Sequence, residues 1–374
     1  MSKSKKAFLV EISAGVVDVD NRLWFSAIGF NSLFCYNIIE DNLEWKGIFP
    51  EETYWKSFLY RNCVIYRNNI VFAPYNAKNF VIYNTITNSF KTVKIPEIFQ
   101  EKSMKFYCMT VFKDNVIAFG DKVPCILTLN MQTFEVTQND KLYEELNLNG
   151  KKEVDYFICR KIISQSDTER LLIGAKTNIL IHYDVSNMKY WYERLGDDSG
   201  IYNNFIKDGD YLFLVPGKNR KFAVWDMGKK KLYEYGTTIT QNAQYYLEYE
   251  FDNSIVILPE KGDAIIRWKK DSNELNIDYE LMKSLSDGCT ELSDNGEIAK
   301  FLFVNDNDNY RVLFSRINKK LYIFDKHEKT VRSKELLLDL RTRNVIKTEM
   351  EKGMGNIWIE NAFYSLADFL GEDI

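Results

Sequence analysis

LFLVPGKNRKFAVWD, at residues 212–226, is one of seven copies of a single 15-residue pattern in this chain. Each copy has an apolar run, a small residue or a proline in fifth place, a polar loop, and a second run with a large side chain in fourteenth place. Six of the seven copies close on Asn or Asp. These copies, called blocks below, align without gaps at residues 23–37, 70–84, 116–130, 170–184, 212–226, 255–269 and 311–325.

The recurrent positions of the block have mechanical explanations. The fifth residue is Ala, Pro, Gly or Ser, and we expect it where inner strands converge and a large side chain would collide. The closing Asn or Asp can hydrogen-bond to its own backbone and start a turn. In five repeats an apolar residue lies six positions after the block, where it would return the outermost strand to the core: Phe90, Tyr190, Leu232, Leu275 and Val331.

Each repeat also contains short strand-like runs on both sides of the block. The block starts are 42 to 56 residues apart, a period typical of propellers and solenoids. Strands are predicted upstream at 58–66, 105–112, 155–163, 205–208, 245–251 and 301–304, and downstream at 90–95, 190–195 and 232–235. Four strands repeated seven times, without helical periodicity between them, predict an all-β fold: one seven-bladed β-propeller over residues 1–374, with four antiparallel strands per blade.

The ends and two long connections carry further elements. Residues 141–153 and 280–297 can each hold a turn or two of helix. The C-terminal extension, 343–374, is expected to include a short helix at 365–370, where Ser365 and Asp368 have capping-box spacing. An extra strand that closes the propeller could come from residues 7–12 or from 343–360, and both alternatives stay open.

The order of elements resembles a kelch-type propeller over roughly residues 20–340. The resemblance rests on an apolar strand, a glycine or small residue, a loop, a strand ending in Tyr or Trp and then Asp, a short turn, and an aromatic residue. Gly120 and Gly174 stand where kelch repeats carry the first glycine of their pair, but no repeat has the double glycine. The resemblance therefore implies the fold and no functional residue.

Composition favours a cytoplasmic protein without membrane or nucleic-acid partners. The chain is 45% hydrophobic, and its net charge of −4 is small for 374 residues. The N-terminal apolar run stops at Glu11, too early for an export segment, and no run is long enough to cross a bilayer. The six cysteines are scattered without a CxxC, so we interpret them as small buried hydrophobic residues rather than as disulfides.

The sequence contains no recognisable catalytic set. Its two histidines, His182 and His327, belong to different repeats, which argues against His-based nucleophilic catalysis and against a His-based metal site. Residues 306–309, DNDN, lack the glycine and distal Glu of a calcium loop and are expected to form a hairpin turn. We therefore predict no cofactor and no metal and favour a chain that is not an enzyme, with carboxylate chemistry left open because 53 Asp and Glu residues offer many pairs.

Two features concern the loops of one propeller face. The loop inside the block carries Lys or Arg in six of the seven copies, which would form either a solvated rim or one that attracts anions: Lys78, Lys122, Lys176, Lys218, Arg220, Lys261, Arg316 and Lys319. Aromatic residues precede the innermost strands and would either stack on a sugar or peptide or cap the core: Trp55, Tyr156, Tyr202 and Tyr245.

The function expected from these features is non-catalytic binding or scaffolding, with a protein, anionic or glycan ligand on the loop face. One alternative is a carbohydrate-active enzyme, a glycosidase or lyase, that uses carboxylates at the central channel. Another alternative is a structural subunit of a larger assembly, which predicts a contiguous apolar patch on the outer blade edges.

Overall fold

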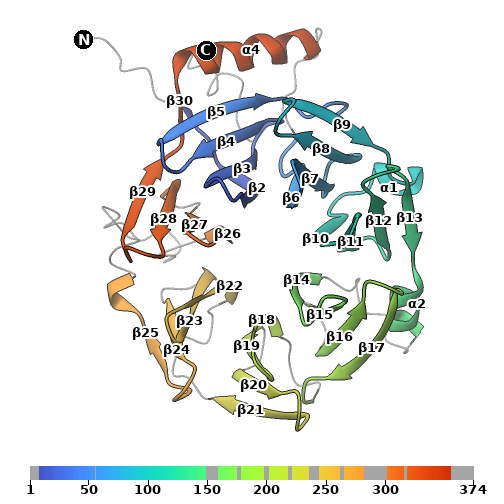
Figure 1. The fold of residues 1–374 in the computed structure, drawn as a ribbon, viewed down its shortest axis with the longest axis vertical. Helices are drawn as coiled ribbons and strands as arrows, with labels where there is room; N and C mark the ends of the chain where they lie inside the picture. The colour runs from blue at the N-terminus through green and yellow to red at the C-terminus, as the bar shows by residue number, and fades with distance from the viewer. Residues whose placement is uncertain are drawn as a thin grey trace. The chain divides into compact units, whose positions relative to one another are not determined.

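The computed structural model describes residues 8–54, 56–148, 159–174, 178–197, 202–217, 221–235, 244–261, 265–281, 301–315 and 318–354. Over these ranges the chain forms seven four-stranded antiparallel sheets, each built from four strands in chain order (Figure 1). They are the blades of a β-propeller, so the predicted fold class is confirmed. The blades are numbered one to seven along the chain.

The first four blades are built as follows. Blade one contains β2 (Ile12–Val17), β3 (Arg22–Ala27), β4 (Leu33–Asn37) and β5 (Asn42–Gly47). Blade two contains β6 (Tyr60–Tyr66), β7 (Asn69–Pro74), β8 (Phe80–Asn84) and β9 (Ser89–Val93). Blade three contains β10 (Phe106–Phe112), β11 (Asn115–Gly120), β12 (Ile126–Asn130) and β13 (Val136–Asn139). Blade four contains β14 (Cys159–Ser164), β15 (Glu169–Gly174), β16 (Ile179–Asp184) and β17 (Lys189–Arg194).

The remaining three blades repeat the same order. Blade five contains β18 (Tyr202–Asp208), β19 (Tyr211–Pro216), β20 (Phe222–Asp226) and β21 (Lys231–Tyr235). Blade six contains β22 (Gln244–Phe251), β23 (Ser254–Lys261), β24 (Ile266–Lys269) and β25 (Leu275–Ile277). Blade seven contains β26 (Phe301–Asp306), β27 (Tyr310–Ser315), β28 (Lys320–Asp325) and β29 (Val331–Glu335). In every blade the sequence block supplies the second and third strands.

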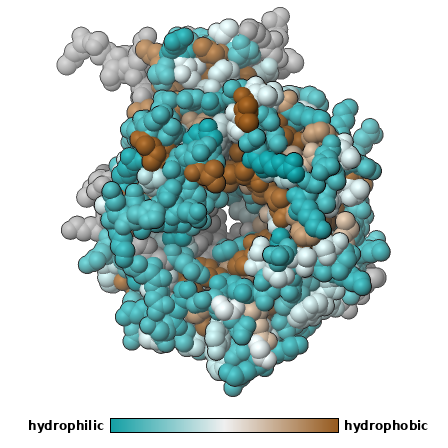
Figure 2. Space-filling model, in the orientation of Figure 1, coloured by the Kyte–Doolittle hydropathy of each residue, from teal (hydrophilic) through white to brown (hydrophobic). Residues whose placement is uncertain are grey.

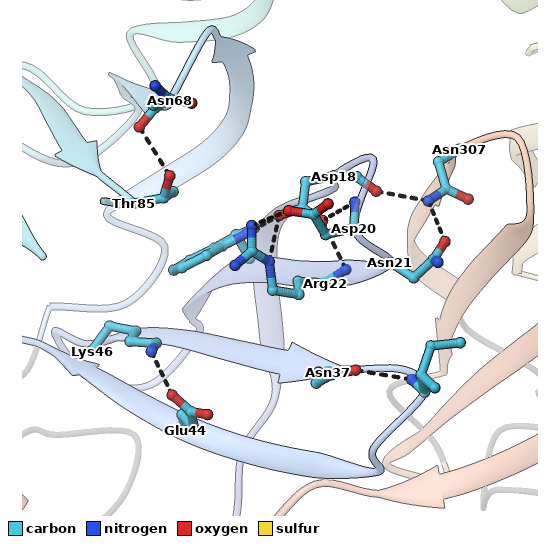
Figure 3. A network of polar contacts seen from close by, with 12 residues as sticks. Asp18, Asp20, Asn21, Arg22, Asn37, Glu44, Lys46, Asn68, Thr85 and Asn307 are labelled. Carbon is cyan, nitrogen blue, oxygen red and sulfur yellow. Dashed lines mark hydrogen bonds and ion pairs between the residues drawn. The ribbon is translucent and has the colours of Figure 1, made fainter. Parts of the chain in front are cut away.

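The closing Asn or Asp of each block builds the turn that follows it. The side-chain Oδ1 of Asn37 accepts hydrogen bonds from the backbone N–H groups of Ile39 and Glu40 (Figure 3), and five other blocks make the same kind of bond. Four residues after each block the backbone takes the left-handed conformation, in all seven blades: Asp41, Asn88, Phe134, Met188, Lys230, Asn273 and Lys329. A turn followed by a left-handed residue is a common way to join antiparallel strands.

A second recurrent bond ties the two hairpin turns of each blade together. The N–H of the residue that follows the block donates to the carbonyl of the residue two places before the block, over 2.7 to 3.1 Å, in all seven blades. In blade two, for example, the Thr85 N–H donates to the Asn68 carbonyl, which also accepts the Thr85 hydroxyl at 3.1 Å (Figure 3). Both turns of a blade therefore lie at the same end of its sheet.

The large fourteenth residue of the block packs beside the outermost strand. Tyr83 lies directly opposite Phe90, and Trp225 lies directly opposite Leu232. Blades one and three, which are outside the five repeats named above, have the same pairing. Tyr36 lies opposite Leu43, and Leu129 lies opposite Val136. The predicted packing against the core is confirmed for Phe90, Tyr190, Leu232 and Leu275 and is wrong for Val331, which is 40% exposed.

The fifth residue of the block ends the second strand beside a bulge in the innermost strand. Gly120 pairs with Phe106, and the register then shifts before Cys108. A Cβ atom on Gly120 would lie 1.9 Å from the Val123 carbonyl oxygen and 2.7 Å from that of Cys125. Five other blades have a register shift at the same place. The need for a small residue is therefore steric at Gly120.

The chain forms two compact units. Unit 1 comprises residues 1–103, 305–314 and 319–374, and it holds blades one and two and most of blade seven. Its core includes Trp24, Tyr60, Phe72 and Tyr83, all at most 2% exposed. Unit 2 comprises residues 104–304 and 315–318, with blades three to six. Its apolar clusters join blades three and four, four and five, and five and six.

Blades seven and one of unit 1 are joined by a polar network (Figure 3). The Asn305 Oδ1 accepts the Val17 N–H at 2.8 Å. The Asn307 Nδ2 donates to the Asp18 carbonyl at 2.7 Å. The Asp18 carboxylate is itself held by Trp24 Nε1 and Arg22 Nε, each at 2.8 Å. Asn307 Oδ1 also accepts the N–H groups of its own turn, so the prediction of a hairpin at 306–309 is confirmed.

The extra elements differ in part from expectation. Helix α2 (Lys141–Leu148) forms where a short helix was predicted, and helix α1 (Glu97–Gln100) follows blade two. Strand β1 (Phe8–Leu9) pairs with β30 (Leu337–Leu338) in a separate two-stranded sheet rather than within blade seven. The predicted helix at 365–370 and nearly all of the segment at 280–297 lie outside the described residues.

The alternative of a closing strand at 343–360 is wrong for residues 343–354, because they belong to helix α4 (Leu340–Met354). Asp339 caps this helix: its Oδ1 accepts the Thr342 N–H at 2.8 Å, and its Oδ2 accepts the Thr342 hydroxyl at 2.7 Å. Arg343 and Ile346 are buried at helical spacing, which a strand would place on opposite faces.

Four cysteines lie in the described core and are free thiols: Cys35, Cys63, Cys108 and Cys125. Burial raises the pKa of the Cys35 thiol to about 12, and burial also raises the pKa of the Cys63 thiol. Because the thiolate is the reactive species, both groups should be inert in the folded protein.

We predict that iodoacetamide at pH 8 labels Cys35 and Cys63 only when denaturant is added. Peptide mapping by mass spectrometry measures the labelled fraction at each cysteine. Rapid labelling of either residue in native buffer would contradict the burial of these thiols.

Gly120→Ala should destabilise blade three by about 3 kcal/mol, because the new methyl group overlaps two backbone carbonyl oxygens. Gly209→Ala is the matched control, since Gly209 has a φ of +56° but no atom within 4 Å of an added Cβ. That control should cost only about 1 kcal/mol. Urea unfolding compares the two, and equal losses would refute the steric explanation.

Asn37→Ala should lower the free energy of unfolding by about 1 kcal/mol, because two backbone donors lose their acceptor. Asn37→Asp keeps the acceptor and should retain most of the stability, as Asp184, Asp226 and Asp325 do in their own turns. Thermal melts of the two variants check this, and the explanation fails if Asp destabilises as much as Ala.

Candidate functional site

Most of the predicted loop-face residues are not placed by the structure. Trp55, Tyr156, Lys176, Lys218, Arg220 and Arg316 lie outside the described residues. For Tyr245 and Lys261 the structure describes only the backbone, in β22 and β23. Lys122 is exposed in the loop after β11, whereas the Tyr202 side chain is 0% exposed and packs in the core between blades four and five. The loop-face site therefore stays a prediction. Tyr202 is not an exposed ligand contact, because it lies in the core, as the alternative interpretation of the aromatic residues predicted.

The two remaining loop lysines each lie near a carboxylate. Lys78 Nζ is 3.6 Å from Glu101 Oε1, and Lys319 Nζ is 3.6 Å from Glu11 Oε1. Such surface ion pairs contribute little to stability, and they reduce the positive charge that these two lysines present. Within unit 1, the described part of the loop face is therefore mixed in charge rather than basic.

A different cluster, in blade four of unit 2, brings several chemically active side chains together. His182 lies on β16, directly opposite Trp191 on β17. Two residue pairs further along the same hairpin, Glu193 lies opposite Leu180. Because side chains two residues apart share a face of a strand, His182, Trp191 and Glu193 lie on one face of the sheet.

Both nitrogens of His182 face carboxylates. Its Nδ1 lies 2.6 Å from Glu169 Oε1, and its Nε2 lies 3.3 Å from Glu193 Oε1. The imidazole ring stacks on the Trp191 indole with centroids 3.5 Å apart and an interplanar angle of 12°. His182 is only 6% exposed, so these contacts hold the ring inside the sheet face.

A lysine from blade five completes the cluster. Lys230, in the turn between β20 and β21, places its Nζ 3.8 Å from Glu193 Oε2 and 5.7 Å from the Trp191 ring centroid. This ammonium therefore joins the two blades through one ion pair and one cation–π contact. The recurrent turn holds Lys230 in the left-handed conformation, which sets the direction in which its side chain leaves the backbone.

Beside this cluster lies an exposed aromatic and basic surface. Trp191 is 49% exposed and Tyr211, at the start of β19, is 44% exposed. Tyr211 lies opposite Asp226, whose carboxylate is 3.0 Å from Lys229 Nζ. Backbone and side-chain hydrogen bonds from Lys229 hold the pKa of Asp226 below its usual value. We call this set the Trp191 surface; it consists of Trp191, Tyr211, Lys229, Lys230 and Lys231.

The geometry suits binding better than acid–base chemistry. A catalytic His182 would have to leave two carboxylates and a stacked ring before it could reach a substrate proton. Within the described residues, no group of three or more His, Cys, Asp or Glu side chains is arranged to hold a metal ion. A half-exposed indole with fixed neighbours presents a rigid apolar contact surface at little entropic cost.

The sequence did contain a signal for this cluster that the block pattern hid. His182 and Trp191 fall in neighbouring strands of one hairpin at positions that the recurrent turn places opposite each other. The residues 229–231, three consecutive lysines, lie in the equivalent hairpin of the next blade. The cluster lies on the third and fourth strands and the turn between them, whereas the predicted site residues lie inside the blocks or before the innermost strands.

Comparison with known proteins shows the fold alone. No family model matches the chain, and no curated protein sequence is similar to it. Solved structures are similar at low identity. A streptogramin B lyase has a TM-score of 0.58 and 13% identity, covering 89% of this chain and 97% of its own. YCF48 bound to D1 peptide has a TM-score of 0.57 and 8% identity, covering 91% and 97%. BamB from Moraxella catarrhalis has a TM-score of 0.51 and 10% identity, covering 88% and 90%.

These similarities support a β-propeller and do not single out the kelch type.

No helix in the described ranges is both long and apolar enough to cross a membrane. On the face drawn in Figure 2, hydrophilic residues predominate and hydrophobic ones are exposed in separate groups.

Proposed function

We propose that this chain is a binding propeller that docks a protein partner, with Trp191 at the centre of the contact. The observation that carries the proposal is the half-exposed indole, held in place by His182 beneath it and Lys230 beside it. Trp and Tyr are the residues most often found at energetic hot spots of protein interfaces. The Trp191 surface offers both, on strands rather than on loops.

The folds that resemble this chain are compatible with such a role. One of the similar structures, YCF48, is bound to a peptide. At 8% identity this likeness transfers no partner and no residue, so the proposal depends on the geometry of the Trp191 surface. A kelch-type origin, a cytoplasmic location and the enzyme and structural-subunit alternatives stay predictions from the sequence.

Trp191→Ala should abolish capture of the partner, because the variant loses the indole without touching the paired strands. Tyr279→Ala is the matched control, since Tyr279 is also in unit 2 and is 70% exposed. Tagged full-length chain and both variants are compared by quantitative mass spectrometry of proteins retained from the source cells. We expect a set of proteins to be lost with Trp191→Ala and kept with Tyr279→Ala.

Thermal melts of both variants establish that the comparison concerns binding. If Trp191→Ala melts normally and retains the same proteins as the unaltered chain, Trp191 is not the docking site and the proposal falls.

A further inference from the structure

The basic residues of the Trp191 surface are concentrated in one turn. Residues 228–231 read GKKK, and all three lysines are exposed. The side chains of Lys229 and Lys230 are each 67% exposed although each lies near a carboxylate. Lys231 Nζ lies over the Tyr233 ring, 5.0 Å from its centroid. Of these three ammonium groups, that of Lys230 lies beside the exposed indole, and the other two belong to the residues that flank it in the turn.

The nearby carboxylates leave N–H donors of these ammonium groups available for another acceptor. An ammonium has three N–H donors, and Lys229 uses one of them on Asp226 at 3.0 Å. Lys230 lies 3.8 Å from Glu193, which is ion-pair distance but longer than a hydrogen bond. Both lysines can therefore contact a second carboxylate from outside without giving up their present neighbours.

The aromatic rings favour an occupant with methylene groups beside its charges. Trp191 and Tyr211 present apolar area next to the lysines, which a small inorganic anion would leave uncovered. Glutamate side chains have a carboxylate at the end of two methylene groups, so an acidic peptide can contact ring and ammonium together.

From this arrangement we infer that the partner docked on the Trp191 surface presents an acidic, glutamate-rich segment, whose carboxylates contact Lys229, Lys230 and Lys231 while its methylene groups cover Trp191. This inference rests on the proposed function and names the chemistry of the partner. Attraction between charges at an interface rim acts mainly on the association rate and falls with salt.

The test uses a fluorescein-labelled deca-glutamate peptide and fluorescence anisotropy with the full-length chain. The substitutions Lys229→Gln, Lys230→Gln and Lys231→Gln, made together, should weaken binding about tenfold at low salt. A control carries Lys94→Gln, Lys113→Gln and Lys141→Gln, which remove three exposed lysines elsewhere and the same net charge. The control should change the affinity less than about twofold.

The outcomes distinguish failure of this inference from failure of the proposed function. Equal weakening in the two triple variants would show attraction by net charge only and would overturn the acidic-segment inference. The inference also falls if the lysine variants keep the captured partner while Trp191→Ala loses it, although the proposed function then stands. If Trp191→Ala retains every partner, the proposed function fails and this inference falls with it, even where the peptide requires the three lysines.

Discussion

The fold of each blade depends on one backbone hydrogen bond that the sequence block sets up. The N–H after the block donates to the carbonyl two residues before it, and so joins the first hairpin turn of the blade to the second. Both groups would otherwise lie unpaired at the end of a sheet, which costs free energy unless water replaces the partner. The bond recurs in all seven blades, so the residues of the turn after the block have the same backbone position in each blade.

The Trp191 surface follows from that constraint. In blade four the recurrent turn sets the register that places Trp191 opposite His182. In blade five the same turn puts Lys230 in the left-handed conformation and directs its side chain to Glu193 and Trp191. Two copies of one structural unit therefore supply the two halves of the cluster, each with different side chains.

Much of the fold could be predicted because its cause is local. Alternating apolar residues specify the two strands of each block, and these strands form in every blade. The closing Asn or Asp builds the following turn in six blades, whereas the block of blade six ends in Lys269. Strand ends were less predictable. The first strand of blade two begins at Tyr60 rather than at residue 58, because Phe58 has a φ of +53° and its N–H donates to the Ile28 carbonyl, a contact between distant segments. Helix α4 differs from the expected strand because Asp339 caps its first turn and the helix buries Arg343 and Ile346, contacts that lie outside the repeated block.

The candidate site was harder to predict than the fold. The expected aromatic residue Tyr202 is buried, since its strand packs between neighbouring sheets that the sequence does not show side by side. His182 looks isolated in the sequence, yet its two carboxylate partners come from the neighbouring strands β15 and β17. Lys230, which lies beside Glu193 and Trp191, comes from another blade. A pattern read within one repeat cannot show contacts made between repeats.

Hydrogen exchange measured by NMR tests the central claim most directly. The amides of Ile38, Thr85, Met131, Val185, Met227, Lys270 and Lys326 should all exchange slowly, although each lies in a turn rather than in a strand. Protection of all seven would show that the block builds the same unit each time. Rapid exchange at several of these amides, with the neighbouring strands still protected, would contradict the account.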